Sequence, residues 1–69
     1  MAKLYTNIKK FRAIKYIKQE DLAKLVGVRR ETIVHLEAGH YNPSLKLAYD
    51  ISKVFGVPIE EIFSFKEEE

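Results

Sequence analysis

Four residues in the middle of the chain carry functional groups that suit one kind of chemistry. Arg30 and Glu31 come at the start of an expected helix, Val34 lies beside them, and His35 follows Glu31 by the four residues that separate neighbours on one helical face. A guanidinium can bond O6 and N7 of guanine, a carboxylate can accept from N4 of cytosine, and an apolar side chain can contact the methyl group of thymine. These groups suit contacts with base edges, although Glu31 and His35 also fit an ordinary surface pair beside a solvated arginine.

Charge is distributed unevenly along the 69 residues, whose net charge is only +2. Residues 1–30 carry nine Lys or Arg against two acidic residues, whereas residues 54–69 carry one Lys against five Glu. A basic half attracts a polyanion such as nucleic acid, and an acidic end is expected to point away from it. Scattered, solvated charge is the alternative, so charge by itself does not decide the function.

Length and composition exclude several classes of protein. A chain of this size is expected to form one domain, 1–69, of marginal stability that a second subunit would improve. The absence of Cys excludes disulfides and thiolate metal sites and favours the cytoplasm, and no apolar run approaches the roughly 18 residues of a membrane span. No nucleophile, carboxylate pair or glycine-rich phosphate loop predicts an enzyme. His35 and His40 do not share a helix face, so we expect no metal, cofactor or small-molecule ligand.

Three helices are expected in the first half of the chain. The first spans residues 6–15, with Thr6 placed to cap it, and an earlier start near Lys3 is the alternative. Its inner face holds Ile8, Phe11 and either Ile14 or Lys15. A second helix begins with acidic residues in its first turn and ends at Gly27, and a third spans residues 30–37 and ends at Gly39.

Two further helices are expected in the second half. Ser44 caps a helix that runs to Phe55, and a short helix over 59–63 follows a Gly-Val-Pro break. The inner stripe of the longer helix is Leu45 or Leu47, Ala48, Ile51 and Phe55. The prediction is therefore an all-α, compact five-helix bundle with its core over 6–63. An acidic tail, 64–69, completes the chain, and a short C-terminal strand is considered there.

The spacing within residues 19–38 is the most specific signal, because it describes two helices joined by a turn too short for antiparallel packing. Close crossing requires a small side chain, which Ala23 supplies, and Gly27 gives the backbone the freedom to turn. The shared core is expected to consist of Leu22, Val26, Val28, Ile33 and Leu36. Seven suitable residues within twenty positions are seldom reached by chance and indicate a helix-turn-helix.

These residues, together with Gln19-Glu20-Asp21, Leu36-Glu37, Gly39 and Tyr41-Asn42-Pro43-Ser44-Leu45, resemble the phage-repressor and Cro type of helix-turn-helix domain. The resemblance extends over about residues 6–63, since Val54 to Phe63 also matches the end of that family's domain. It implies that the second helix of the pair, about residues 30–37, lies in the major groove of double-stranded DNA while the first crosses the backbone.

The resemblance also assigns roles to individual side chains. The expected base-reading residues are Arg30, Glu31, Val34 and His35. The expected phosphate contacts are Gln19, Lys18, Arg29, Thr32, His40 and Asn42. Asn42 fits a turn residue ahead of Pro43 equally well. Arg12 and Glu37 match a salt bridge between the first and third helices, which we expect to be buried and to set the orientation of those helices.

Three features of the chain depart from the family pattern. Lys18 and Arg29 occupy N-cap positions that usually hold Ser or Thr, so the capping hydrogen bond is lost and positive charge stands at the unfavourable end of each helix. Tyr16 stands where a glycine often ends the first helix, so the chain is either strained there or continues the helix. Ala38 replaces a common asparagine that contacts phosphate, which implies a weaker grip on the backbone.

Symmetry favours a homodimer, because two recognition helices related by a twofold axis reach major grooves about 34 Å apart. A twofold dimer implies a palindromic operator. We also expect regulation by repression. The preferred dimer contact is an antiparallel pairing of Phe63, Ser64 and Phe65 with the same residues of a second copy, and packing of the last helix against its mate is the alternative. An antitoxin-type autorepressor and a helix-turn-helix scaffold for protein–protein interaction are the other functions considered.

Overall fold

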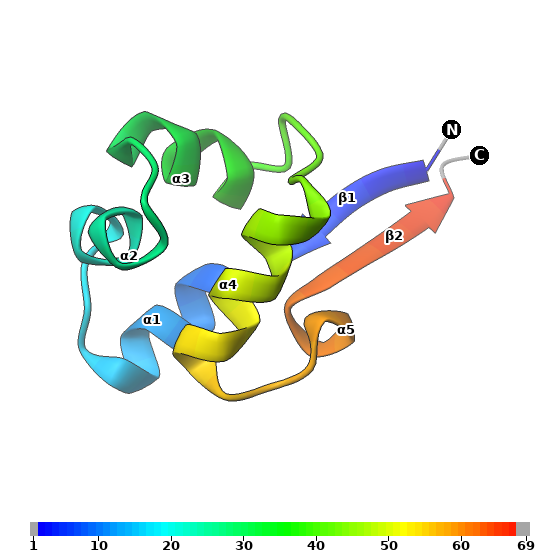
Figure 1. Cartoon of the computed structure of the whole chain (residues 1–69). Coiled ribbons are helices and arrows are strands. Elements are labelled where there is room, and N and C mark those ends of the chain that lie inside the picture. The colour runs from blue at the N-terminus through cyan, green and yellow to red at the C-terminus, as the bar shows by residue number, and fades with distance from the viewer. Residues whose placement is uncertain (1, 68–69) are drawn as a thin grey trace.

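Five helices and two strands follow one another along residues 2–67, which are the residues that the computed structural model describes. In chain order they are β1 (Ala2–Thr6), α1 (Ile8–Lys15), α2 (Gln19–Val26), α3 (Arg30–Glu37), α4 (Leu45–Phe55), α5 (Ile59–Ile62) and β2 (Phe63–Glu67) (Figure 1). The five predicted helices are confirmed. The tail predicted at 64–69 is a strand up to Glu67, and its last two residues lie outside the described part of the chain.

The two strands form an antiparallel sheet that joins the two ends of the described chain. Leu4 pairs with Phe65 and Thr6 with Phe63, and the sheet extends away from the helices (Figure 1). The strand predicted at the C-terminal end is thus present, but one of its edges is taken by the chain's own residues 2–6. Residues 2–6 were not predicted as a strand, because five residues are too few to show a clear alternation of apolar and polar side chains.

The helix α1 begins at Ile8, later than predicted, because the chain as far as Thr6 belongs to the sheet. Thr6 belongs to β1, and Asn7 takes the N-cap position without a capping bond from its side chain. Instead the Asn7 backbone N–H donates to the carbonyl of Ile62 at 2.8 Å, and its Nδ2 donates to the carbonyl of Glu61 at 2.9 Å. Asn7 therefore ties the beginning of the helical body to the end of α5.

The core lies between the helices, and Leu4 of β1 and Phe63 of β2 are buried with it. Its fully buried side chains are Ile8, Leu22, Ile33, Leu36, Ile51 and Ile62. Phe11 of α1 stacks on Phe55 of α4 with ring centroids 5.6 Å apart. Leu47 belongs to the inner stripe of α4, and Leu45, the other candidate, is 79% exposed. In α1 both candidates for the last inner position, Ile14 and Lys15, are exposed. The inner face of α1 therefore ends at Phe11.

The residues at the helix ends suit the local backbone conformation to different degrees. Ser44 Oγ accepts from the backbone N–H of Leu47 at 3.1 Å, and Gly27 ends α2 in the left-handed region at φ 73°. Tyr16 ends α1 at φ 57°, the only non-glycine residue with positive φ among residues 2–67, so the chain is strained there and does not continue the helix. At α2 the lost N-cap bond is partly replaced, because the Lys18 N–H donates to Asp21 Oδ2 at 2.8 Å.

No helix within residues 2–67 combines the length and the apolar composition that crossing a bilayer would require.

Candidate nucleic-acid interface

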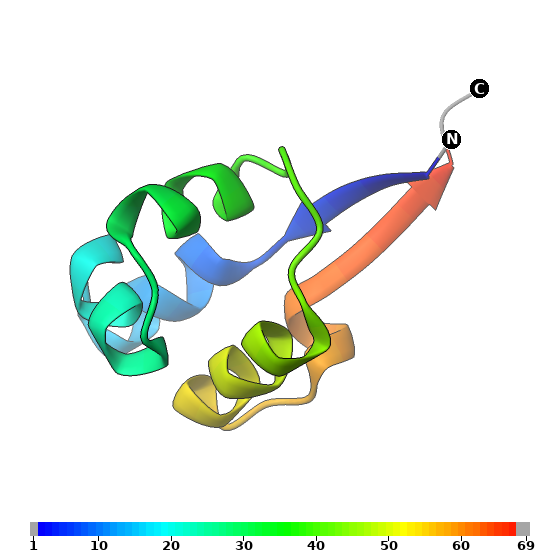
Figure 2. The same cartoon turned by 45° about the horizontal axis from the view of Figure 1, so that its top comes forward.

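The crossing of α2 and α3 is the structural basis of the site. Ala23 is buried where the two helices meet, among Leu22, Ile33 and Leu36. The turn begins at Gly27, and the backbone N–H of Val28 donates to the carbonyl of Ala23 at 2.9 Å. In Figures 1 and 2, α3 lies at the outside of the molecule with α2 beside it. This geometry leaves one long side of α3 open to solvent.

The predicted base-reading residues lie on that open side of α3. Arg30, Glu31 and His35 are exposed and Val34 is half-buried, whereas Ile33 faces the core. None of the first three is needed to fill the core. Their side chains are therefore available to a ligand that approaches α3 from outside.

A shallow hollow of about 790 Å³ lies next to this side of α3 and is lined by Arg29, Glu31, Thr32, His35, His40 and Tyr41. The rings of His35 and His40 lie with their centroids 6.2 Å apart, although they do not share a helix. The chain turns back through Gly39 at φ 75°, which carries His40 over the end of α3. The five-residue separation was therefore a poor guide to their distance. Within residues 2–67 no group of three or more possible metal-ligating side chains is found.

Tyr41 is the residue of this hollow that sequence reasoning missed. Its phenol is partly exposed, and burial raises the pKa of the group above its ordinary value. A phenol is protonated at neutral pH even without this rise, so the hydroxyl can donate a hydrogen bond. The available signal was an aromatic residue between two predicted phosphate contacts, His40 and Asn42.

An ion pair locks α1 to α3 behind the exposed side. Arg12 Nε donates to Glu37 Oε2 at 2.6 Å and Arg12 Nη2 donates to Oε1 at 3.0 Å, so the contact is bidentate. The two side chains are 14% and 11% exposed, which confirms the predicted pair as largely buried. Arg12 Nη1 also donates to the carbonyl of Ile17 at 3.2 Å. Together these bonds fix the end of α3 relative to the start of α2.

Gln19 joins this network, which the sequence did not predict. Its Nε2 donates to Glu37 Oε1 at 3.2 Å, and the side chain is half-buried. An amide has a second N–H and a carbonyl oxygen, so one bond to Glu37 leaves polar groups for another partner. The bond restricts the amide to one place at the beginning of α2.

The pattern that describes the helix-turn-helix family matches residues 8–62, which is most of the chain and includes all five helices. The chain belongs to the Cro/C1-type helix-turn-helix family. A curated relative from Archaeoglobus fulgidus, named as an HTH-type transcriptional regulator, is 67% identical over 93% of this chain and 90% of its own length. The cryptic phage CTXphi transcriptional repressor RstR of Vibrio cholerae is 32% identical over 90% of this chain and 56% of its own length.

A solved structure shows the same fold as this helix-turn-helix protein. The restriction-modification controller protein C.AhdI from Aeromonas hydrophila superposes with a TM-score of 0.72 at 27% identity, over 80% of each chain. The family is one of DNA-binding regulators and is not an enzyme class.

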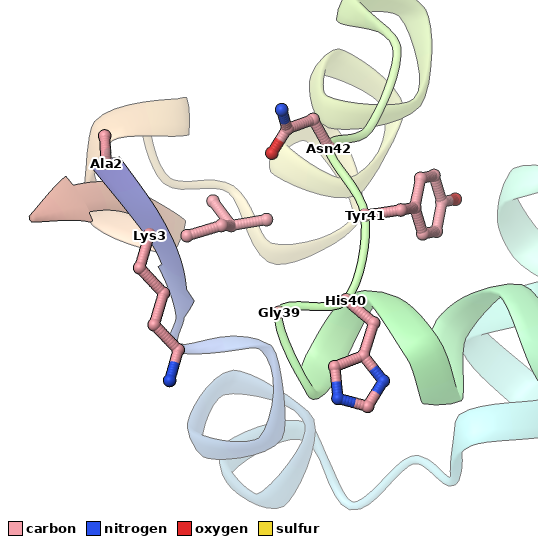
Figure 3. Close-up of a pocket in the computed structure, with 7 residues that line it drawn as sticks. Ala2, Lys3, Gly39, His40, Tyr41 and Asn42 are labelled. Atoms are coloured by element: carbon pink, nitrogen blue, oxygen red, sulfur yellow. The ribbon is translucent and has the colours of Figure 1, made fainter.

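The remaining predicted residues of this helix-turn-helix protein are divided between two places. Lys18 and Arg29 are exposed at the N-terminal ends of α2 and α3, and Thr32 is half-buried one turn into α3. Asn42 is exposed in the loop after α3, but in Figure 3 its side chain points away from that of His40. The structure thus gathers Arg29, Thr32 and His40 around the hollow, whereas Asn42 lines a neighbouring pocket that it shares with His40.

Proposed function

We propose that this chain is a homodimeric repressor that inserts α3 into the major groove of a palindromic operator. The chain is a DNA-binding transcriptional regulator, and the proposal adds how it binds. One observation carries it: the open side of α3 holds Arg30, Glu31 and His35 free of the core, while a largely buried ion pair fixes that helix from behind. A rigid helix with unengaged polar groups is what direct readout of bases requires.

In this proposal Arg30 bonds guanine, Glu31 accepts from cytosine, Val34 contacts a thymine methyl group and His35 completes the face. Phosphate contacts come from Gln19 and from the cations and polar groups that surround α3. These residues are Lys18, Arg29, Thr32, His40 and Asn42. Gln19 supports the assignment because its bond to Glu37 holds the amide in place at the N-terminal end of α2, where the helix dipole favours an anion. The regulator works on DNA, so we place it in the cytoplasm.

Selection of bound fragments from a pool of random duplexes tests the proposal and defines the operator. With about six to eight phosphates neutralised per dimer, the logarithm of the affinity should fall against the logarithm of the salt concentration with a slope of about −5 to −7. Fluorescence anisotropy across salt concentrations measures that slope. A purified chain that ignores duplexes even at low salt contradicts the proposed function.

Two variants separate base reading from backbone contact. Arg30→Ala should weaken binding to the selected operator by about 1–3 kcal/mol and relax the preference at one base pair, whereas Gln19→Ala should weaken all sequences alike. Anisotropy with the operator and with duplexes changed at single positions provides both readouts. A loss spread evenly over every sequence in Arg30→Ala would contradict the base-reading assignment.

The dimer contact we propose is the outer edge of β2, where residues 63–65 pair with the same residues of a second copy. In the described sheet β2 is hydrogen-bonded to β1 alone, so its other edge has no strand beside it within residues 2–67. Phe65 is exposed, whereas Phe63 is buried in the core. Removing the whole segment would therefore damage the fold, and a single substitution is the better test.

Phe65→Glu should shift the protein from dimer to monomer, because in this pairing residue 65 of each copy lies opposite residue 63 of the other, so each introduced carboxylate would face an apolar side chain across the strands. Sedimentation velocity over a range of concentrations measures the change. Tyr49→Glu, at a similarly exposed aromatic position on α4, is the matched control and should leave the dimer intact. A dimer that survives Phe65→Glu but not Tyr49→Glu would move the interface to the helices.

A further inference from the structure

Two lysines and a tyrosine form a cluster on the solvent side of the sheet, opposite the face that carries Leu4. Lys3 and Lys66 are directly paired across the strands, and Tyr5 lies two residues along from Lys3 on the same face. The ring centroid of Tyr5 is 5.7 Å from Lys3 Nζ and 5.1 Å from Lys66 Nζ. All three side chains are exposed, Tyr5 by 41%. We call these residues the sheet lysine cluster.

The free protein gains little from this arrangement. Like charges directly opposite each other in an antiparallel pair are unfavourable, and a neutral or oppositely charged residue at either position would suit the sheet better. The Tyr5 ring attracts both ammonium groups and so holds them together, although they repel each other. Two exposed cations held side by side form a surface that a polyanion would stabilise.

The cluster is continuous with the surface around α3. Lys3 also lines a pocket of about 470 Å³ with the loop after α3, and Figure 3 shows its side chain on the same side as the ring of His40. The residues that line this pocket include no acid. His40 in turn lies beside His35 of α3, with ring centroids 6.2 Å apart. A line of basic and polar side chains therefore runs from the outer side of α3 to the sheet.

We propose that the sheet lysine cluster is a second contact for the phosphates of the DNA backbone, alongside the groove contact of α3. The proposal rests on the proposed function, because the same duplex must lie on α3. Duplex DNA presents one negative charge for about every 1.7 Å of its axis, so a duplex on α3 that continues over His40 brings phosphates to Lys3 and Lys66. Lysine binds phosphate as a point charge and carries no sequence information.

Lys3→Gln, Lys66→Gln and the double variant test this proposal. The probe is a fluorescein-labelled duplex of about 30 base pairs of mixed sequence, together with any operator obtained by selection. Each single variant should weaken binding to all duplexes alike and should reduce the magnitude of the salt slope by about 1–2, and the double variant should reduce it further. Thermal unfolding should show no loss of stability, because one member of a repelling pair is removed.

Lys53→Gln is the matched control. Lys53 Nζ lies 5.3 Å from the ring centroid of Tyr49 on α4, so it has the same contact with an aromatic ring. The C-terminal half of α4 lies on the side of the molecule away from α3 (Figures 1 and 2). Lys53→Gln should therefore leave the salt slope at its original value.

The outcomes separate the two proposals. If the unaltered protein binds duplexes with a steep salt slope and the double variant keeps that slope, the sheet lysine cluster does not contact DNA and this inference is wrong. If Lys53→Gln lowers the slope as much as Lys3→Gln, the effect is one of overall charge, which also overturns it. If the unaltered protein binds no duplex, the proposed function itself fails.

Discussion

Arg12→Met should lower the free energy of unfolding by about 3–5 kcal/mol. The variant leaves the Glu37 carboxylate, which is 11% exposed, without the two hydrogen bonds that its partner donates. The carbonyl of Ile17 loses a donor as well. A chain of this length is expected to have a total stability of about 3–10 kcal/mol, so the loss is a large part of the whole. Urea unfolding followed by circular dichroism, at one fixed protein concentration because a dimer is expected, measures it.

Two comparisons show whether burial is the cause. The double variant Arg12→Met, Glu37→Leu removes both charges and should recover most of the lost stability, since no charge is left alone in the interior. Lys46→Met breaks an exposed pair with Asp50, in which Lys46 is 80% exposed, and should change stability by less than about 1 kcal/mol. If Arg12→Met costs no more than Lys46→Met, the pair is not an anchor of the fold.

The same network links stability to DNA binding. Glu37 accepts from Gln19 as well as from Arg12, so the double variant that restores stability leaves the Gln19 amide without this partner. We therefore expect that variant to fold and still to bind duplexes more weakly than the unaltered protein. The comparison distinguishes the positioning of Gln19 from the stability of the whole domain.

Gly39→Ala should destabilise the protein by about 2–5 kcal/mol, for two reasons that add. The backbone has φ 75°, where a side chain costs about 1–2 kcal/mol. In addition, a Cβ atom at this position would lie 2.6 Å from the carbonyl oxygen of Leu4 in β1, and backbone cannot move aside as a flexible side chain can. Forcing such an overlap typically costs about 1–3 kcal/mol more.

Gly56→Ala isolates the first of these two effects. Gly56 has a similar φ of 69°, but an added Cβ would meet nothing within 4 Å. It should therefore cost only about 1–2 kcal/mol. Thermal and urea unfolding of both variants give the difference. Equal losses at the two glycines would mean that the approach of β1 to the end of α3 contributes nothing, and the loop that carries His40 would then be free of the sheet.

The helices could be predicted because their signals are local. Ser44 bonds a backbone N–H three residues ahead of it, and Gly27 ends the helix that it directly follows. Each depends on residues within one turn, so a single sequence contains the needed information. The crossing of α2 and α3 could be predicted as well, since a small residue and a glycine four positions apart restrict two short helices to few arrangements.

The side chains of the site were predicted in part. Glu31 and His35 were placed on one exposed face, with Arg30 in the first turn beside them, because helical spacing decides which residues are neighbours. Their roles toward DNA stay predictions. The position of Gln19 was predicted, but its bond to Glu37 was not, because the two residues belong to different helices and meet only through the tertiary packing. The closeness of His35 and His40 was missed for a related reason: it depends on the direction in which the chain leaves Gly39.

The five helices, the helix-turn-helix and the exposed face of α3 follow from the amino-acid sequence, because short-range hydrogen bonds and helical periodicity are properties of neighbouring residues. Three features became visible in the folded chain and not before: residues 2–6 pair with 63–67, Gly39 must be small to admit β1, and Lys3, Tyr5 and Lys66 form one cluster. Strand pairing joins segments at opposite ends of the chain, and its register depends on packing between those ends, which no local pattern records.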